Sequence, residues 1–172
     1  DLDLVDTYEP EPEELYARTA QAEDAARAVP GITNSEGADA GWGRSTVALV
    51  TSGGFAAAYS GTSHSVSASV IAGEGTGMER DYDYSSVRFV KDLEDAATIG
   101  RQAGERAVKR LNPRKVKSGP APVIFDPRVS NGLLGHLAGA INGASVARGT
   151  SFLRDKMNEK IFADGIVIVD DP

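Results

Sequence analysis

The stretch STVALVTSGGF (residues 45–55), followed by YSGTSHSVSASVIA (residues 59–72), decides the fold class of this chain. Apolar and small polar residues alternate in both segments, which is typical of strands with one buried face. The Gly53-Gly54 pair between them predicts a tight turn. Residues 81–90 form a third strand-like segment, reached through the glycine-rich residues 73–77. Three successive strands joined by short turns favour an antiparallel sheet.

The strand predicted over residues 59–72 has two very different faces. Because neighbouring side chains of a strand point to opposite faces, four serines share one of them. These are Ser63, Ser65, Ser67 and Ser69. Their small side chains would leave the face flat enough to receive a peptide or a partner subunit, although an ordinary solvated sheet face is the simpler alternative. His64 lies on the other face, so we expect it to be half-buried in the sheet and unpaired with the adjacent serines.

Two pairs of carboxylates could serve as ligands for a hard cation. Asp81 and Asp83 share one strand face, while Tyr82 and Tyr84 fill the opposite one, and Asp170-Asp171 lies near the end of the sequence. The alternation is also ordinary for an amphipathic strand, and we expect solvated carboxylates instead of a metal site.

Two long helices accompany the predicted strands. Residues 12–29 begin with a proline and two glutamates and stop at Pro30-Gly31. Residues 92–111 have an acidic start and a basic end, which complement the helix dipole. Small residues such as Gly100 and Gly104 line one face of the second helix and predict a close backbone approach.

The segment 114–121, which contains Gly119-Pro120, predicts a domain boundary. We therefore expect an α+β fold for residues 1–117, with a mainly antiparallel sheet of three to four strands and two packing helices. Residues 118–172 would begin a second α/β domain. Its expected elements are a buried strand at 122–125, a helix at 132–143, a capped helical stretch near Ser151 and a strand at 165–169.

Composition excludes several classes of protein. The net charge of −7 argues against nucleic-acid binding, which depends on neutralising phosphates. No apolar run approaches the ~18 residues of a membrane span. Cysteine is absent, which excludes disulfides and thiolate chemistry in these residues and is compatible with a cytoplasmic location. The start at Asp1 and the end after a strand-like run predict an internal fragment.

The segment GLLGHLAG (residues 132–139), followed by GTSF (residues 149–152), resembles the core helix of the TldD/PmbA family of DNA gyrase modulators and microcin-processing proteins. In the TldD half of that family, this helix carries H-E-x-x-x-H, which binds zinc and supplies a general base. Aligned on Gly-Thr-Ser, the three motif positions fall on Leu134, Gly135 and Gly139. None of these can ligate a metal or move a proton. The chain therefore resembles the PmbA (TldE) half.

The histidine beside these positions does not restore a set of metal ligands. His136 has only Gly132, Leu133, Gly139 and Ala140 at helical ligand spacing, and we expect it to be a hydrogen-bonded packing residue. A one-residue slip of the alignment, onto Gly135, His136 and Ala140, gives no better set. Four further segments resemble the family in the same order: 31–38, 45–55, 122–127 and 167–172.

The resemblance implies a role within a protease. The parent would be a two-domain protein that forms a heterodimer with a TldD-like catalytic subunit and acts on unfolded peptides. The partner would hold the single zinc, so this chain would have no catalytic residue, no metal and no cofactor of its own. The serines at 63, 65, 67 and 69 are the candidate peptide-binding residues. The alternatives are an active peptidase whose site lies outside these residues, and a standalone peptide-binding module.

Overall fold

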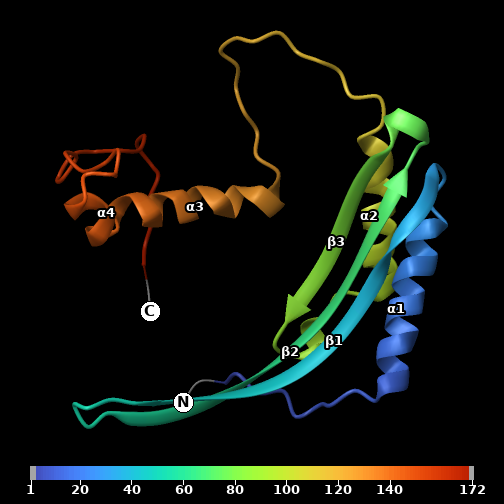
Figure 1. The fold of residues 1–172 in the computed structure, drawn as a ribbon, viewed down its shortest axis with the longest axis horizontal. Helices are drawn as coiled ribbons and strands as arrows, with labels where there is room; N and C mark the ends of the chain where they lie inside the picture. Colours follow the sequence, from blue (N-terminus) through green and yellow to red (C-terminus); the bar gives the residue numbers. More distant parts are fainter. Residues whose placement is uncertain (1–2, 171–172) are drawn as a thin grey trace. The chain divides into compact units, whose positions relative to one another are not determined.

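The computed structural model describes residues 3–170. The chain divides into two units, Asp1–Val116 and Lys117–Pro172. The first unit contains the sheet with its two long helices, and the second contains two further helices (Figure 1). No helix among residues 3–170 combines the length and the apolar character that a bilayer crossing requires.

The sheet of the first unit is antiparallel, as predicted. Its strands are β1 (Ile32–Val50), β2 (Ala56–Ala72) and β3 (Glu79–Val87), in the order β1-β2-β3. The turn at residues 51–55 and the short 3-10 helix Gly75–Gly77 connect them. The segments 31–38 and 45–55, which resemble the family separately, lie mostly in one continuous strand, because β1 runs from Ile32 to Val50. Two register shifts, one of them next to Gly37 with φ +115°, let the strand continue through a local irregularity.

Both long helices cover the same face of the sheet (Figure 1). They are α1 (Pro12–Arg27) and α2 (Ala96–Lys109). Helix α2 packs on β2 and β3, and α1 packs on β1 and β2. The core between helices and sheet contains mainly alanine and β-branched residues, including Ala22, Ala26, Val66, Val70 and Ile99. The second helix starts at Ala96 and not at Asp92, because the Asp95 side chain caps it by accepting a hydrogen bond from the Thr98 N–H (2.9 Å). A short 3-10 helix, Val90–Asp92, precedes this cap.

The predicted close approach along the second helix is confirmed at Gly100. A Cβ atom on Gly100 would lie 1.9 Å from the carbonyl oxygen of Ala22, so only glycine fits between α1 and α2 at this point. Gly104 is similarly restricted by Val29, 2.7 Å from its ideal Cβ position. At Gly100 the two helices therefore touch through backbone atoms.

The β1–β2 pair extends beyond the part of the sheet that the helices cover. Beyond the pairing of Arg44 with Thr62, the hairpin continues as a two-stranded ribbon that projects from the unit (Figure 1). Several large apolar side chains of this ribbon are exposed. They are Val47, Leu49, Val50, Phe55 and Tyr59.

The second unit, in its described residues, contains α3 (Pro127–Ile141) and α4 (Gly143–Ala147) but no strand. The expected strands at 122–125 and 165–169 are wrong: both segments lack strand pairing and are exposed, with Ile124 at 96%. A strand needs a hydrogen-bonded partner, and the described residues provide none for these segments. No helix follows Ser151, because the next residues form turns. Its buried hydroxyl donates to the carbonyl oxygen of Ala140 at 2.6 Å and accepts from the N–H of Leu153 at 3.0 Å.

Candidate functional site

The four serines of β2 lie on the sheet face that neither α1 nor α2 covers. We call this surface the serine face; it comprises Ser63, Ser65, Ser67, Ser69 and the residues that the strand register places beside them. On β1, the partners of Ser63, Ser65 and Ser69 are Gly43, Gly41 and Gly37. The partner of Ser67 is Asp39, whose exposed carboxylate interrupts this row of glycines. The alternation predicted from the sequence therefore holds, and the register adds a second row that consists of three glycines and one aspartate.

Two tyrosines border this strip on the β3 side. Tyr84 is the register partner of Ser67, and Tyr82 is the partner of Ser69. Their rings are stacked, with centroids 6.3 Å apart, and about half of each side chain is exposed. The sequence placed both tyrosines opposite Asp81 and Asp83 but could not assign them to the serine face, because that assignment requires the β2–β3 register.

One end of the serine face carries a charged group of its own. The Ser69 hydroxyl donates to Glu36 Oε2 at 2.8 Å, and Arg80 Nη1 donates to the same oxygen at 3.1 Å. The hydroxyl of Ser69, followed by the Arg80 guanidinium, holds the pKa of Glu36 below its usual value. Within the described part of the chain, the hydroxyls of Ser63, Ser65 and Ser67 make no side-chain hydrogen bond. Three of the four hydroxyls are therefore available to a ligand.

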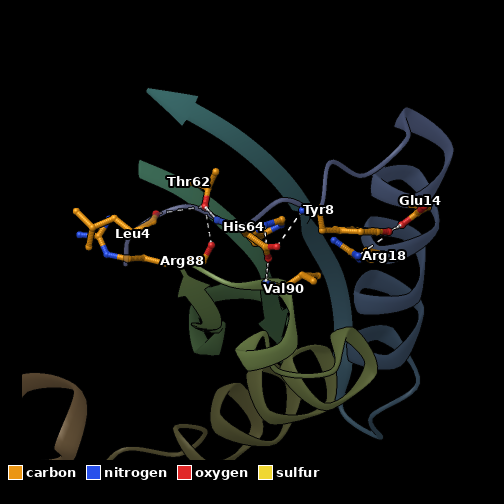
Figure 2. Close-up of polar contacts among 9 residues, drawn as sticks. Leu4, Tyr8, Glu14, Arg18, Thr62, His64, Arg88 and Val90 are labelled. Carbon is orange, nitrogen blue, oxygen red and sulfur yellow. Dashed lines mark hydrogen bonds and ion pairs between the residues drawn. The ribbon is translucent and has the colours of Figure 1, made fainter. Parts of the chain in front are cut away.

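His64 lies on the opposite face and is fully buried, not half-buried as expected. Its Nε2 atom lies 3.3 Å from Oδ2 of Asp6, which comes from the segment before α1 (Figure 2). The ring of Tyr8 packs near the imidazole, at 6.2 Å between centroids. Neither neighbouring serine contacts His64, so the structure contains no Ser-His pair at this position.

Asp6 joins several backbone segments at this point. Its carboxylate accepts hydrogen bonds from the backbone N–H groups of Tyr8 (2.9 Å) and Val90 (2.7 Å) (Figure 2). These N–H groups, more than the nearby His64 and Lys91, lower the pKa of Asp6 from its ordinary value. The folded structure therefore stabilises the negatively charged form of Asp6.

Asp81 and Asp83 are buried, which corrects the expectation of solvated carboxylates. They lie on the helix-covered face, where Asp83 forms an ion pair with Arg106 and Asp81 lies 3.6 Å from Nη1 of Arg110. Both arginines belong to α2 or its C-terminal end, which the sequence alone could not place over β3. The two carboxylates therefore help to attach the helix to the sheet. Of the second candidate pair, Asp170 is exposed and Asp171 lies outside the described residues.

The three degenerate zinc positions lie on α3 of the second unit. Leu134 is about half exposed, and Gly135 and Gly139 line a hollow of about 610 Å³ together with His136. His136 is exposed, so the expectation of a hydrogen-bonded packing residue was wrong. Residues 3–170 contain no group of three or more His, Cys, Asp or Glu side chains suited to a metal. A leucine, two glycines and one histidine do not make a zinc ligand set.

Comparison with known proteins gives consistent matches over both units. Residues 6–111 match the family model described as the PmbA/TldA metallopeptidase central domain, and residues 118–172 match the model of its C-terminal domain. The chain is 40% identical to Metalloprotease PmbA of Escherichia coli O157:H7, an alignment that covers 100% of this chain and 38% of that protein. A Metalloprotease PmbA homolog of Haemophilus influenzae is 32% identical with the same coverage. The chain thus spans well under half the length of these relatives.

Two solved structures share the fold. A candidate DNA gyrase modulator from Bacteroides thetaiotaomicron matches with a TM-score of 0.84 and 33% identity, over 94% of this chain and 37% of that one. A protein of the same description from Thermotoga maritima matches with a TM-score of 0.81 over 92% of this chain and 37% of that chain. At 17% identity the second match concerns the fold alone.

Proposed function

The chain belongs to the PmbA/TldD metallopeptidase family, and from this premise we propose that it is a non-catalytic, substrate-holding or structural part of a heterodimeric zinc metalloprotease. A TldD-like partner subunit would supply the zinc and the general base. The substrates would be unfolded peptides. We further propose a cytoplasmic location, with which the cysteine-free sequence is compatible.

The observation that carries the proposal is the side-chain chemistry of α3. Zinc in proteins is bound by thiolate, imidazole or carboxylate groups. Leu134, Gly135 and Gly139 occupy the three positions of H-E-x-x-x-H in the alignment on Gly-Thr-Ser, and none has such a group. His136, the one donor nearby, has no second ligand at helical spacing. The 40% identity to a protein named PmbA supports the same half of the family.

The serine face supports the substrate-holding part of the proposal. The two helices do not cover it, exposed aromatic rings border it, and three of its hydroxyls are unused by other side chains. Such a surface can accept an extended peptide with little steric selection. Tyrosine rings add apolar contact area at a low cost in conformational entropy.

The test is co-expression of the full-length protein with a TldD-like partner, followed by a cleavage assay on an unfolded peptide with and without a zinc chelator. We expect cleavage by the pair, loss of cleavage with chelator, and no cleavage by either subunit alone. Metal analysis of the separately purified full-length protein should find no stoichiometric zinc. One zinc per chain would contradict the proposal.

The second candidate function is an active peptidase whose ligands lie outside residues 1–172. Two facts about the Escherichia coli relative favour it: that protein is named Metalloprotease PmbA, and the chain covers only 38% of it. Chelator-sensitive cleavage by the full-length protein without any partner would establish this alternative. Failure to co-purify with a TldD-like subunit, combined with peptide binding, would instead favour a standalone binding module.

A further inference from the structure

We propose that the hairpin end of the serine face is a subsite for a peptide carboxylate, with Arg88 as its cation. The proposal rests on the peptide-holding role above and adds a chemical preference to it: bound peptides would carry a carboxylate at one end of the face.

A hollow of about 370 Å³ lies at this end of the sheet. It is lined by residues of both strands of the hairpin and by Arg88, which follows β3 directly. Small residues on the serine face form much of its lining: Gly43, Ser45, Gly61 and Ser63. The hollow is thus continuous with the serine face through Ser63.

The Arg88 guanidinium lies over Gly61 of β2. A Cβ atom added to Gly61 would come within 3.1 Å of Nη1 of Arg88. Glycine at this position therefore makes room for the charged group above the sheet. Arg88 also continues the alternation of Tyr82 and Tyr84, so that its position belongs to the same face.

The charge of Arg88 is unusual in this acidic chain. The net charge is −7, and other arginines of the first unit form ion pairs with carboxylates. Among residues 3–170, Arg88 forms no ion pair. Arg27, Arg44 and Arg114 are also unpaired. Arg27 and Arg114 lie on exposed surface away from this hollow, whereas Arg44 is among its lining residues but holds a register position, opposite Thr62, that belongs to the other sheet face. Arg88 is therefore the unpaired arginine that lines the hollow from the serine face.

The backbone around Arg88 is held in place by hydrogen bonds. Thr62 Oγ1 donates to the carbonyl oxygen of Arg88 at 2.9 Å, and the N–H of Val90 donates to Asp6 at 2.7 Å (Figure 2). The N–H of Thr62 in turn donates to the carbonyl oxygen of Leu4 at 3.0 Å. A fixed backbone lowers the entropy that binding has to offset, because only the Arg88 side chain remains to be ordered.

The guanidinium group selects the chemistry of the ligand. Its planar donors match a carboxylate in a bidentate arrangement, and the hydroxyls of Ser45 and Ser63 line the same hollow. From Ser69 to Ser63 an extended peptide of about six residues would span ~20 Å along the strand. Its carboxylate at the hairpin end would be either the chain terminus or an Asp or Glu side chain.

The experiment measures binding of three fluorescein-labelled hexapeptides to the full-length protein. The first has a free C-terminal carboxylate, the second a C-terminal amide, and the third an amide with glutamate as its last residue. We expect the first to bind about fivefold more tightly than the second, the upper range for an exposed ion pair. Arg88→Gln should abolish this difference and leave the affinity of the amide peptide unchanged. Arg27→Gln, which removes the same charge from the exposed end of α1, is the matched control.

The outcomes separate the subsite from the peptide-holding role. If the glutamate peptide binds like the acid peptide, side-chain carboxylates are accepted as well as the terminus. Equal binding of acid and amide peptides, or equal behaviour of the Arg88 and Arg27 variants, overturns the subsite and leaves peptide holding intact. If no peptide binds, the peptide-holding role fails, and sodium acetate is then titrated into full-length protein with ¹⁵N-labelled arginine. A shift of the Arg88 Nε–H signal supports a carboxylate site alone, and no shift overturns that as well.

Discussion

His64 and Asp6, 58 positions apart in the sequence, meet at 3.3 Å between Nε2 and Oδ2. The contact joins β2 to the segment before α1, and the same carboxylate accepts a hydrogen bond from Val90 in the segment after β3. Three parts of the first unit therefore converge on one side chain. Arg88 lies two residues from this junction, so the position of the proposed carboxylate subsite depends on it.

Asp6→Ala should lower the melting temperature at neutral pH, because two backbone N–H groups lose a charged acceptor. The pKa of Asp6 is lowered from 3.8 in the folded protein. The stabilisation is therefore complete above about pH 3.8 and is lost as the pH falls through the lower folded value. Thermal unfolding of the wild-type protein and the variant should be followed across this pH range. The difference between their melting temperatures should become smaller in acid. Asp3→Ala, which removes an exposed carboxylate nearby in the sequence, should change the melting temperature little. If the difference between wild type and Asp6→Ala did not depend on pH, the stabilising role of the Asp6 carboxylate would be contradicted.

Gly100→Ala should destabilise the first unit strongly. The added methyl group would lie 1.9 Å from Ala22 O, and backbone atoms cannot move aside without separating α1 from α2. We expect a loss of about 3 kcal/mol or more in the free energy of unfolding, at the upper end of the range for overpacking. Chemical denaturation followed by circular dichroism measures it. Gly77→Ala is the matched control, since a Cβ there meets nothing within 4 Å and should cost less than ~0.5 kcal/mol.

Arg106→Met should leave the buried Asp83 carboxylate without its ion-pair partner. We expect a loss of about 2 kcal/mol in the free energy of unfolding, because Arg106 is partly exposed and water can replace part of the interaction. The double variant Asp83→Val/Arg106→Met should recover much of that loss, since both charges are gone. A double-mutant cycle measures the coupling free energy between Asp83 and Arg106. Arg101→Met breaks the exposed pair with Glu105 and should cost under ~1 kcal/mol; equal losses for both arginines would contradict the buried pair.

Ser65→Trp tests the serine face directly. Ser65 lies on the uncovered side of β2 opposite Gly41, so a large ring can project into solvent and the melting temperature should change little. Peptide binding by the full-length protein should fall on the order of tenfold, because the ring would occupy the strip between Gly41 and the tyrosines. Ala17→Trp adds the same bulk to the exposed surface of α1 and should leave binding unchanged. Unchanged binding in the Ser65 variant would remove the serine face from the proposed function.

Much of the first unit could be predicted because its signals are local. The strand alternation over residues 59–72, the turn at Gly53-Gly54 and the small-residue face of α2 all depend on residues close together in sequence, and the structure confirms them. The errors concern partners that are distant. Asp81 and Asp83 were expected in solvent because their arginines come from a helix more than twenty residues further along the chain. The strands at 122–125 and 165–169 were expected from apolar composition, which does not provide a pairing partner.

The sequence by itself determined which side chains share a face of β2 and which donor groups are missing at Leu134, Gly135 and Gly139. The first follows from the two-residue period of an extended backbone, and the second from residue identity once the family alignment is made. Only the tertiary structure decided that helices cover the His64 face, that glycines and tyrosines flank the serines, and that Arg88 stands unpaired at one end. These features depend on strand register and on packing between distant segments. The periodic pattern of residues within one segment specifies neither of them.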